Sequence, residues 1–575
     1  MRKLILLLGF FVVVASSVPA QELTLDNTQP VNTQIQADTL SDGSQAHSVY
    51  KVESGTYYYF DGTLDTDFDL VIEGPDNGWI LHDANPPVFF QTPALDGTNA
   101  GRDMITLNAG GSVVLKNILL TGLFPNDANI SSFVRNFAGY KIVWDNCVFT
   151  DHRDHATRST GATDTISMTN CVFINMDRRG SSPFGGMPFR LDAACTQLTF
   201  ENNTFFNGAR EFGNGGNFFT SKMTEIHNTI LNQQVNGHEI HWYEGLQANN
   251  IYYNWSWRGR NLKTNGYEAP FTTFETFSAV SEKLDSIALY EGINLFYLDP
   301  AFPDYWNNIL NPRFLNDSDK VIQCYLWNLD VDSTINADNN FTIGKNYWQF
   351  DPGFTSNPSQ IDSMLGWDLA NWDTNVTYYP DWRITPPVTW NQDGTPNFNW
   401  PPPFDLTYSN TYLQTAGTDG LPLGDLNWYP SAKATYLANR DQYIAALRDS
   451  MTNATWLYIP GDSASAIVTP DMVDVEYESS NVPANFYLSN NYPNPFNPST
   501  KIEFGLPEQS EVTLSVFNIL GQKVFELTEK SLAAGIHSYN FNASQLSSGI
   551  YVYRVHATSA DGKNFVESKK MMLLK

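Results

Sequence analysis

Two stretches of the chain, WDNCVF at residues 144–149 and MTNCVF at residues 168–173, are near copies of each other. Four more stretches align with them when one asparagine of each is placed in the same column. Apolar residues recur two places before this column and two or three places after it, with mostly polar residues between, as in strands with one buried face. The chain therefore contains an internal repeat, whose aligned residues are Asn117, Asn146, Asn170, Asn202, Asn228 and Asn249.

The lengths of the repeats predict a solenoid. Successive asparagines are 29, 24, 32, 26 and 21 residues apart, by subtraction of their numbers, which suits coils that share strands and differ in their loops. A buried asparagine needs hydrogen-bond partners, and amides stacked at the strand spacing of about 4.8 Å can supply them to one another. We therefore predict an all-β fold in which the six asparagines form one inward ladder.

This pattern resembles the right-handed parallel β-helix of the pectate-lyase-like superfamily, over roughly residues 105–260. The resemblance implies a solenoid domain over residues 21–460, with irregular first coils, insertions and capping segments. One helix is predicted from Ser431 to about Met451, and we expect it to cover an open end of the solenoid core.

The composition fits a folded, β-rich extracellular protein. Of the 575 residues, 42% are hydrophobic, 14% are aromatic and only 16% are charged, and the formal net charge is −28. A protein this acidic is not expected to bind nucleic acid or an anionic membrane surface, because both are recognised by clustered Lys and Arg. Carbohydrate is the partner that suits its many Trp, Tyr and Asn side chains.

Residues 1–20 have the features of a secretory signal peptide. Arg2-Lys3 precedes an apolar run over residues 4–14, and the small residues before Gln21 form a cleavage site. No later stretch is apolar enough to form a transmembrane span. Residues 461–485 are small and acidic, which predicts a linker before a second domain.

That second domain, residues 486–575, carries three distinctive motifs. They are NYPNPFNPST at 491–500, LSSGIYVYR at 546–554 and KKMMLLK at 569–575, with short alternating strands and turn signals between them. The motifs closely resemble the type A C-terminal sorting domain of type IX secretion cargo, an Ig-like β-sandwich. The resemblance implies a Gram-negative cell, recognition by the type IX secretion machinery, and export across both membranes to the cell surface or the medium.

The residues that follow the repeat strands are polar and rich in Arg. Between residues 153 and 260, nine basic residues balance nine acidic ones inside a strongly acidic chain. Because neighbouring coils are about 4.8 Å apart, we expect these side chains to lie along one edge of the solenoid. The predicted edge contains Arg153, Asp154, His155, Asp177, Arg178, Arg179, Arg210, Trp255, Trp257 and Arg258.

In β-helix polysaccharide lyases an Arg or Lys removes a proton beside a uronate carboxylate, while carboxylates hold Ca²⁺. The resemblance therefore implies a possible Ca²⁺ cofactor and five catalytic candidates, namely Arg178, Arg179, Arg210, Asp154 and Asp177. The predicted role of the others is to bind an extracellular, anionic polysaccharide: Arg153, His155, Trp255, Trp257 and Arg258. Paired carboxylates for glycoside hydrolysis, Asp151 with Asp154 or Asp177, are an open alternative.

A non-catalytic alternative is also open. The edge charges can pair with one another in a surface structural or adhesive protein whose solenoid is a rigid spacer. The segment HEIH at residues 238–241 lacks the i, i+4 His pair of a helical zinc site, so no metal site is predicted there. Cys147 and Cys171 share a column, but side chains stacked on parallel strands point the same way, which favours buried thiols over a disulfide.

Overall fold

A computed structural model describes part of the chain, and the predicted signal peptide lies outside that part. The described residues are 22–92, 103–108, 110–122, 132–152, 155–176, 186–208, 212–214, 218–233, 238–239, 242–259, 272–273, 288–316, 320–322, 340–343, 346–357, 360–371, 389–391, 394–397, 400–453, 467–469, 476–478, 486–489, 491, 494, 496–532, 534–559 and 562–574.

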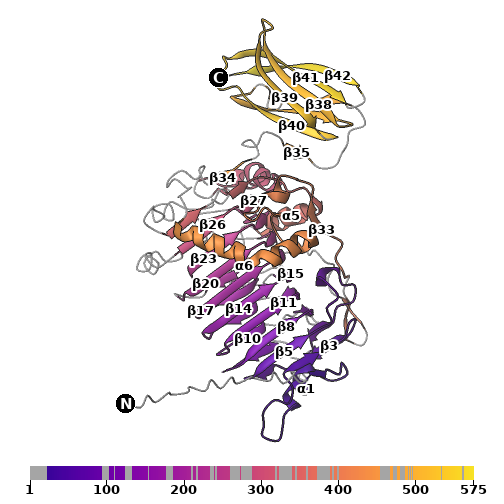
Figure 1. Cartoon of the computed structure of the whole chain (residues 1–575), viewed down its shortest axis with the longest axis vertical. Coiled ribbons are helices and arrows are strands. Elements are labelled where there is room, and N and C mark those ends of the chain that lie inside the picture. Colours follow the sequence, from indigo (N-terminus) through magenta and orange to yellow (C-terminus); the bar gives the residue numbers. More distant parts are fainter. Residues whose placement is uncertain are drawn as a thin grey trace, which may run out of the picture.

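Three parallel sheets form the solenoid, and the chain visits them in turn (Figure 1). Within the described residues, sheet 1 has eleven strands: β1 (Glu22–Thr24), β2 (Val49–Lys51), β5 (Asp69–Glu73), β8 (Ser112–Lys116), β11 (Lys141–Asp145), β14 (Thr163–Thr169), β17 (Cys195–Glu201), β20 (Thr220–Ile226), β23 (Trp242–Ala248), β26 (Ala288–Gly292) and β28 (Asn340–Ile343). This arrangement of stacked parallel strands confirms the predicted β-helix.

The other two sheets close the coils. Sheet 2, again counting described strands, has eleven: β3 (Tyr57–Phe60), β6 (Val88–Gln91), β9 (Leu119–Thr121), β12 (Val148–His152), β15 (Val172–Met176), β18 (Thr204–Gly208), β21 (Thr229–Leu231), β24 (Ile251–Tyr253), β27 (Leu295–Tyr297), β29 (Asn346–Trp348) and β34 (Ile467–Val468). Sheet 3 has six on the same basis: β4 (Leu64–Thr66), β7 (Ile105–Leu107), β10 (Ser132–Asn136), β13 (His155–Ser159), β16 (Met187–Leu191) and β19 (Phe212–Asn214).

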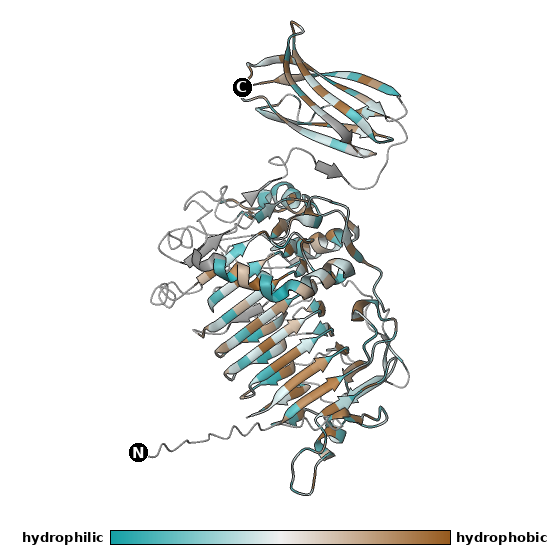
Figure 2. Ribbon diagram, viewed as in Figure 1, coloured by the Kyte–Doolittle hydropathy of each residue, from teal (hydrophilic) through white to brown (hydrophobic). Residues whose placement is uncertain are grey.

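Apolar side chains that repeat from coil to coil fill the space between the sheets. Ile142 pairs in register with Ile166 in sheet 1, and both are fully buried. In sheet 2 the rings of Phe149, Phe173 and Phe205 stack with centroids 5.3 and 4.7 Å apart. Burying each such side chain stabilises the fold by about 1.5–3 kcal/mol, and Figure 2 shows the hydrophobic and hydrophilic residues alternating along the strands.

The six asparagines predicted as one inward ladder occupy two columns instead. Five of them stand at the corner between sheets 1 and 2, the first corner, with positive φ of 53° to 61°: Asn117, Asn146, Asn170, Asn202 and Asn249. In the remaining coil His227, with φ of 56°, takes this place, because Glu201 pairs with Ile226 and the register differs by one residue from the sequence alignment. Asn is favoured here because it tolerates the left-handed conformation that the corner requires.

The buried ladder lies one residue further along the chain. Its members have no exposed surface: Asn203, Asn228, Asn250, Asn294 and Asn346. The side-chain oxygen of each accepts the backbone N–H of the equivalent residue in the preceding coil, at 2.8–3.0 Å. In the preceding two coils this column holds Cys147 and Cys171, which are buried and free.

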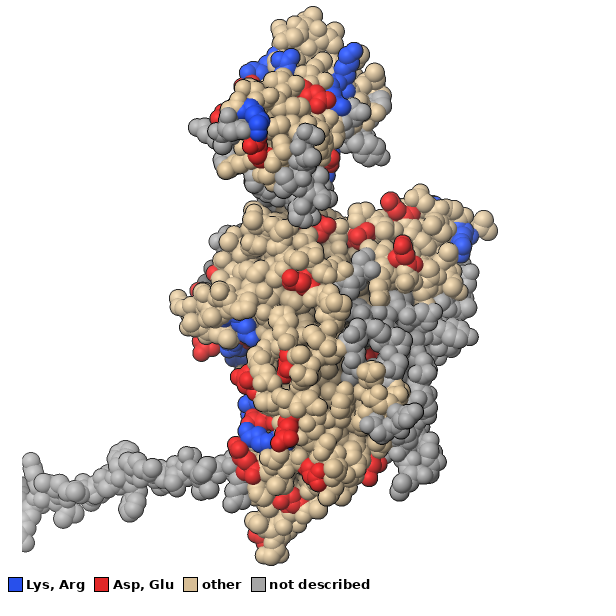
Figure 3. Space-filling model, turned by 90° about the vertical axis from the view of Figure 1, so that its right-hand side faces the viewer, with Lys and Arg blue, Asp and Glu red and all other residues tan. Residues whose placement is uncertain are grey.

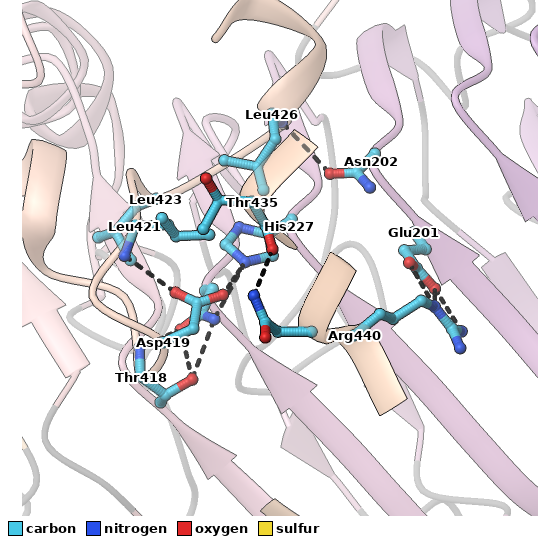
Figure 4. Close-up of polar contacts among 12 residues, drawn as sticks. Glu201, Asn202, His227, Thr418, Asp419, Leu421, Leu423, Leu426, Thr435 and Arg440 are labelled. Carbon is cyan, nitrogen blue, oxygen red and sulfur yellow. Dashed lines mark hydrogen bonds and ion pairs between the residues drawn. The ribbon is translucent and has the colours of Figure 1, made fainter. Parts of the chain in front are cut away.

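A long segment from the C-terminal part of the solenoid, residues 405–453, runs back over the first corner, and we call it the arm. It contains β33 (Asp405–Tyr408), the short helices η6 (Leu413–Thr415) and η7 (Leu426–Trp428), and α6 (Pro430–Asn453). Thr418 N donates to Asn249 Oδ1 at 2.9 Å. Asp419 Oδ2 lies 2.8 Å from His227 Nε2 (Figure 4). The corner column is therefore a docking surface for the arm.

Helix α6 lies along the outer face of sheet 1 (Figure 1), so the expectation that it covers an open end of the core is wrong. Its Tyr436 packs against His227, with ring centroids 4.9 Å apart. Two arginines fix it further, since Arg440 pairs with Glu201 and Arg448 with Glu244, both at 2.6 Å.

At the N-terminal end, α1 (Val31–Ala37) buries Val31 and Ile35 against the solenoid core. Among the described helices, none is both long and apolar enough to span a bilayer.

The C-terminal domain is a sandwich of two antiparallel sheets with its own core. One sheet contains β35 (Glu476–Glu478), β36 (Tyr487–Leu488), β37 (Ser499–Leu506) and β40 (Gly535–Asn542), and the other β38 (Ser510–Asn518), β39 (Lys523–Leu532), β41 (Gly549–Ser559) and β42 (Asn564–Leu573). The predicted linker at 461–485 holds a strand of each domain, because β34 joins sheet 2 and β35 joins the sandwich.

The buried ladder can be tested with Asn228→Leu. The substitution leaves Asn203 N–H and Phe200 O without their bonds to this side chain, at a cost of roughly 1–3 kcal/mol for each group. Asn170→Gly is the control, because φ of 60° suits glycine and Asn170 is only half-buried. Tryptophan fluorescence during urea unfolding reports the solenoid alone, since residues 486–575 contain no Trp. Equal losses in the two variants would contradict the ladder.

A second prediction concerns Asp425, whose carboxylate is buried and accepts hydrogen bonds from Thr204 and Asn427. Burial raises the pKa of Asp425 to about 7, against an ordinary value of 3.8. Between these two pH values the folded protein holds a proton that the unfolded chain has released, so stability falls as pH rises, by up to roughly 4 kcal/mol.

The variant Asp425→Asn lacks this titration. We expect the difference in thermal midpoint between the variant and the wild type to move in favour of the variant as pH rises from 4.5 to 7.5. Other groups titrate in both proteins and cancel in the comparison. A difference that stays constant with pH would contradict the raised pKa.

Candidate functional site

Six of the ten predicted edge residues lie outside the described residues: Arg153, Asp154, Asp177, Arg178, Arg179 and Arg210. In sequence, Arg153 and Asp154 follow β12, Asp177 to Arg179 follow β15, and Arg210 follows β18. Each of these segments leads from a strand of sheet 2 to a strand of sheet 3. This connection is the second corner of the coil. The described residues just before it form another column with positive φ, namely Asp151, Asn175, Asn207, Asn232 and Asn254.

The two tryptophans predicted to stack on sugar rings are core residues. Trp255 is 2% exposed and its ring packs against Phe296, while Trp257 is 1% exposed and packs against Phe302. His155 is also buried, at 4% exposure, at the start of β13. Their positions after the repeat asparagines predicted an exposed edge, but all three side chains are buried and do not fit a surface site.

Arg258 belongs to an internal ion pair. Its Nε lies 2.9 Å from Oδ1 of Asp368, in α5 (Ile361–Asn371), and its guanidinium lies over the ring of Trp367. Tyr305, at the end of α3 (Ala301–Tyr305), donates to the same carboxylate at 3.1 Å. Burial raises the pKa of Asp368, and Arg258 opposes that shift. Arg258 is therefore a structural residue.

The structure brings together a different set of arginines, on sheet 3. Arg135, Arg158 and Arg190 pair in register on β10, β13 and β16, so they form one row across three coils. Their side chains are 17%, 33% and 22% exposed. We call them the arginine row. Because parallel strands are about 4.8 Å apart, the row spans about 10 Å.

Two aspartates partly neutralise the arginine row. Asp103 pairs with Arg135 at 3.2 Å, and Asp192 pairs with Arg158 at 2.6 Å and with Arg190 at 2.8 Å. Three guanidinium groups thus face two carboxylates. Burial raises the pKa of Asp103, and the neighbouring Arg135 opposes that shift.

Arg158 and Arg190 reach Asp192 through their Nε–H groups. Among the described residues, no acceptor is hydrogen-bonded to their terminal Nη nitrogens. A guanidinium whose outer edge is open can hold a carboxylate or sulfate with two parallel hydrogen bonds. The row therefore has the chemistry of an anion site.

The sequence does contain a signal for this row. Arg158 follows Arg135 by 23 residues and Arg190 follows Arg158 by 32, from the differences of their numbers. These intervals track the 24 and 32 residues between Asn146, Asn170 and Asn202. An arginine that recurs at the interval of the repeat occupies the same position in each coil. An alignment that also compares positions other than the asparagines therefore reveals this row in the sequence.

The acidic candidates are less clearly arranged. Asp151, proposed for hydrolysis, is 4% exposed in the second-corner column and accepts hydrogen bonds from Thr150 and Asn175. His238 and Glu239 form β22 (His238–Glu239), and His241 lies outside the described residues. In the described part of the chain no three His, Cys, Asp or Glu side chains gather where they could hold a metal ion. The Ca²⁺ expectation stays a prediction for the second corner.

Comparison with known proteins identifies the C-terminal domain. Residues 490–571 match the family model described as secretion system C-terminal sorting domain. No curated protein matches the chain.

Three solved structures show limited likeness. CopC from Methylosinus trichosporium OB3b is 18% identical with a TM-score of 0.13, and the match covers 16% of this chain and 93% of that one. Dimeric latent PorU from Porphyromonas gingivalis is 18% identical with a TM-score of 0.14, over 16% of this chain and 10% of that one. An engineered protein, target OR128, is 11% identical with a TM-score of 0.13, over 43% and 42%. Scores this low carry no conclusion about function.

The sorting motifs, the sandwich fold and the family match agree with one another. The chain is a β-helix protein that carries a type IX secretion system C-terminal sorting domain at residues 490–571 and is exported to the cell surface or the medium.

Proposed function

We propose that this exported protein binds an anionic polysaccharide along the arginine row of sheet 3. The observation that carries the proposal is the pair of open guanidinium edges on Arg158 and Arg190. A net positive row is unusual in a chain with a formal charge of −28, and it would attract an acidic polymer while the surrounding surface repels it.

The geometry of the row favours a polymer over a single anion. Guanidinium groups that repeat with the strand spacing can engage acidic groups on linked sugar units, and several weak contacts then add to one useful affinity. The second-corner residues connect in sequence to the strands that carry the row. If the protein also depolymerises its ligand, Arg178, Arg179, Arg210, Asp154 and Asp177 are the candidates for that step.

The alternative is a rigid spacer whose charges pair internally. Arg258 with Asp368, and Arg440 with Glu201, support it at those positions. The two functions differ in what the arginine row does in solution, because a spacer has no use for open guanidinium edges.

Binding can be tested by affinity electrophoresis of the mature protein in gels that contain a uronate polysaccharide, a sulfated polysaccharide or a neutral one. In the anionic gels, the double variant Arg158→Gln, Arg190→Gln should be less retarded, and its apparent affinity should be at least tenfold lower than that of the wild type. The reason is that each hydrogen bond to a charged group contributes about 1.5–3 kcal/mol. Arg448→Gln is the matched control, an ion-paired arginine on α6 with 27% exposure.

Retardation that is the same for the wild type and the double variant would remove the arginine row from the function, and no retardation of the wild type would favour the spacer. The same incubations separate the chemistries. New ultraviolet absorbance indicates lyase action, and new reducing ends without that absorbance indicate hydrolysis. If neither signal appears in a gel that retards the protein, the protein binds the polysaccharide without cleaving it.

Export gives a separate prediction. Deleting residues 486–575 removes the sorting domain, so the truncated protein should cross the inner membrane and accumulate in the periplasm. Cell fractionation and protease accessibility on intact cells measure this. The tryptophan fluorescence of the truncated protein shows whether the solenoid still folds, and surface delivery of a folded truncated protein would contradict the assignment.

A further inference from the structure

A polar groove of about 770 Å³ lies at the first corner, on a different side of the coil from the arginine row. Its residues come from sheet 1, from the corner column, from the loop after β5 and from α6. Its lining includes Lys116, Asp145, Asp76, Trp79, Asn146 and Lys433. We call it the corner groove.

The loop after β5 forms one wall because it is tied to the corner column. Ile80 N donates to Asn146 Oδ1 at 2.9 Å, and Asn146 Nδ2 donates to Gly78 O at 2.8 Å. Trp79 Nε1 donates to Asn170 O at 3.2 Å. Gly74 allows the loop to start so close to the coil, since a Cβ there would lie 2.4 Å from Asn117 O.

The arm forms the opposite wall. Trp428 packs edge-on against Trp79 with ring centroids 4.8 Å apart, and α6 brings Lys433 to the groove. Lys433 donates to Asn427, next to the buried Asp425. The groove therefore lies where the loop after β5 and the arm come together over the first corner.

Charges of both signs alternate along the floor. Lys51, Glu73, Lys116 and Asp145 pair in register on neighbouring strands of sheet 1. Lys51 forms an ion pair with Glu73, whereas Lys116 has neither an ion pair nor a hydrogen bond with the described residues. In Figure 3 acidic and basic side chains lie together along the left edge of the solenoid, beside a largely uncharged face.

Open donors and open acceptors thus face the same space. The ammonium group of Lys116 has no partner among the described residues. Asp145 accepts hydrogen bonds from Thr169 and Asn170 through Oδ1, and Asp76 accepts one from Gly78 N through Oδ1. Oδ2 of each aspartate is thus left without a hydrogen bond to the described residues. The lining of the groove contains three lysines and three carboxylates, so its formal charges balance and favour neither an anion nor a cation. A neutral ligand with many hydroxyl groups can satisfy both kinds, because each hydroxyl donates and accepts.

We propose that the corner groove binds a neutral oligosaccharide, with Lys116 and the carboxylates of Asp76 and Asp145 bonded to its hydroxyl groups and Trp79 beside its rings. The volume is within the range of ligand sites, which is about 300–1,000 Å³. This second site is independent of the arginine row, and it gives the protein contacts with two chemically different glycans.

The test uses the full mature protein and neutral hexasaccharides of glucose, mannose and xylose, with a hexuronate as comparison, in isothermal titration calorimetry. Lys116→Met removes the open ammonium group and should weaken the binding of a neutral hexasaccharide by about five- to tenfold. Lys141→Met is the matched control, because Lys141 is a half-buried lysine on β11 that does not line the groove. Asp76→Asn keeps the acceptor for Gly78 N and should give a smaller loss.

Each outcome decides the proposal. Weaker binding in the Lys116 variant with unchanged binding in the Lys141 variant supports it. Equal affinity in the wild type and the Lys116 variant overturns the site, as does the failure of all neutral hexasaccharides to bind. Binding of the hexuronate alone, in a manner that depends on Lys116, overturns the ligand class. The Arg158 and Arg190 double variant should bind the neutral ligand like the wild type, so the two proposals fail separately.

Discussion

The structure depends on how each coil turns the first corner. One residue there adopts a left-handed conformation, and the next points inward, where it must replace the hydrogen bonds that the strands no longer make. From Asn203 to Asn346 a side-chain amide supplies this bond to the coil before it. In the earlier coils the inward place is held by Cys147 and Cys171, where the core is packed with apolar side chains instead. The first corner thus needs one residue that tolerates a positive φ and, next to it, one whose side chain can bond a buried N–H group. Asparagine meets both requirements.

The corner column also determines what lies outside the solenoid. Its exposed amides would need water or protein partners, and the arm and the loop after β5 provide them at different coils. The arm also buries two acidic side chains of its own, Asp425 and Asp419, and the second lies beside His227 of the corner column. The arm and the loop after β5 are far apart in sequence, and both are fixed to the corner column. In the sequence alignment, the asparagines of this column were interpreted as core residues. The corner groove is a consequence of this docking, because its two walls are the loop and the arm.

Electrostatics separate the two candidate binding surfaces. On sheet 3 three arginines face two aspartates, which leaves open guanidinium edges suited to acidic groups. At the first corner lysines and carboxylates alternate in register, which suits a neutral polyhydroxyl ligand. Both surfaces use the same device, since side chains on successive coils repeat at the strand spacing. A solenoid can in this way present a different repeating row of side chains on each side, while the sorting domain places the protein outside the cell.

The sequence by itself determined the repeat, the parallel β-helix, the sorting domain and export, because apolar periodicity and short motifs are local properties of the chain. It did not determine which residue of each coil faces inward, since Asn202-Asn203, His227-Asn228 and Asn249-Asn250 fit the column in either register. Only strand pairing decided this, by placing Ile226 opposite Glu201. The burial of Trp255 and Trp257 and the ion pair of Arg258 with Asp368 likewise follow from how the coils stack and where the chain turns. These are contacts between residues distant in sequence, which no local pattern records.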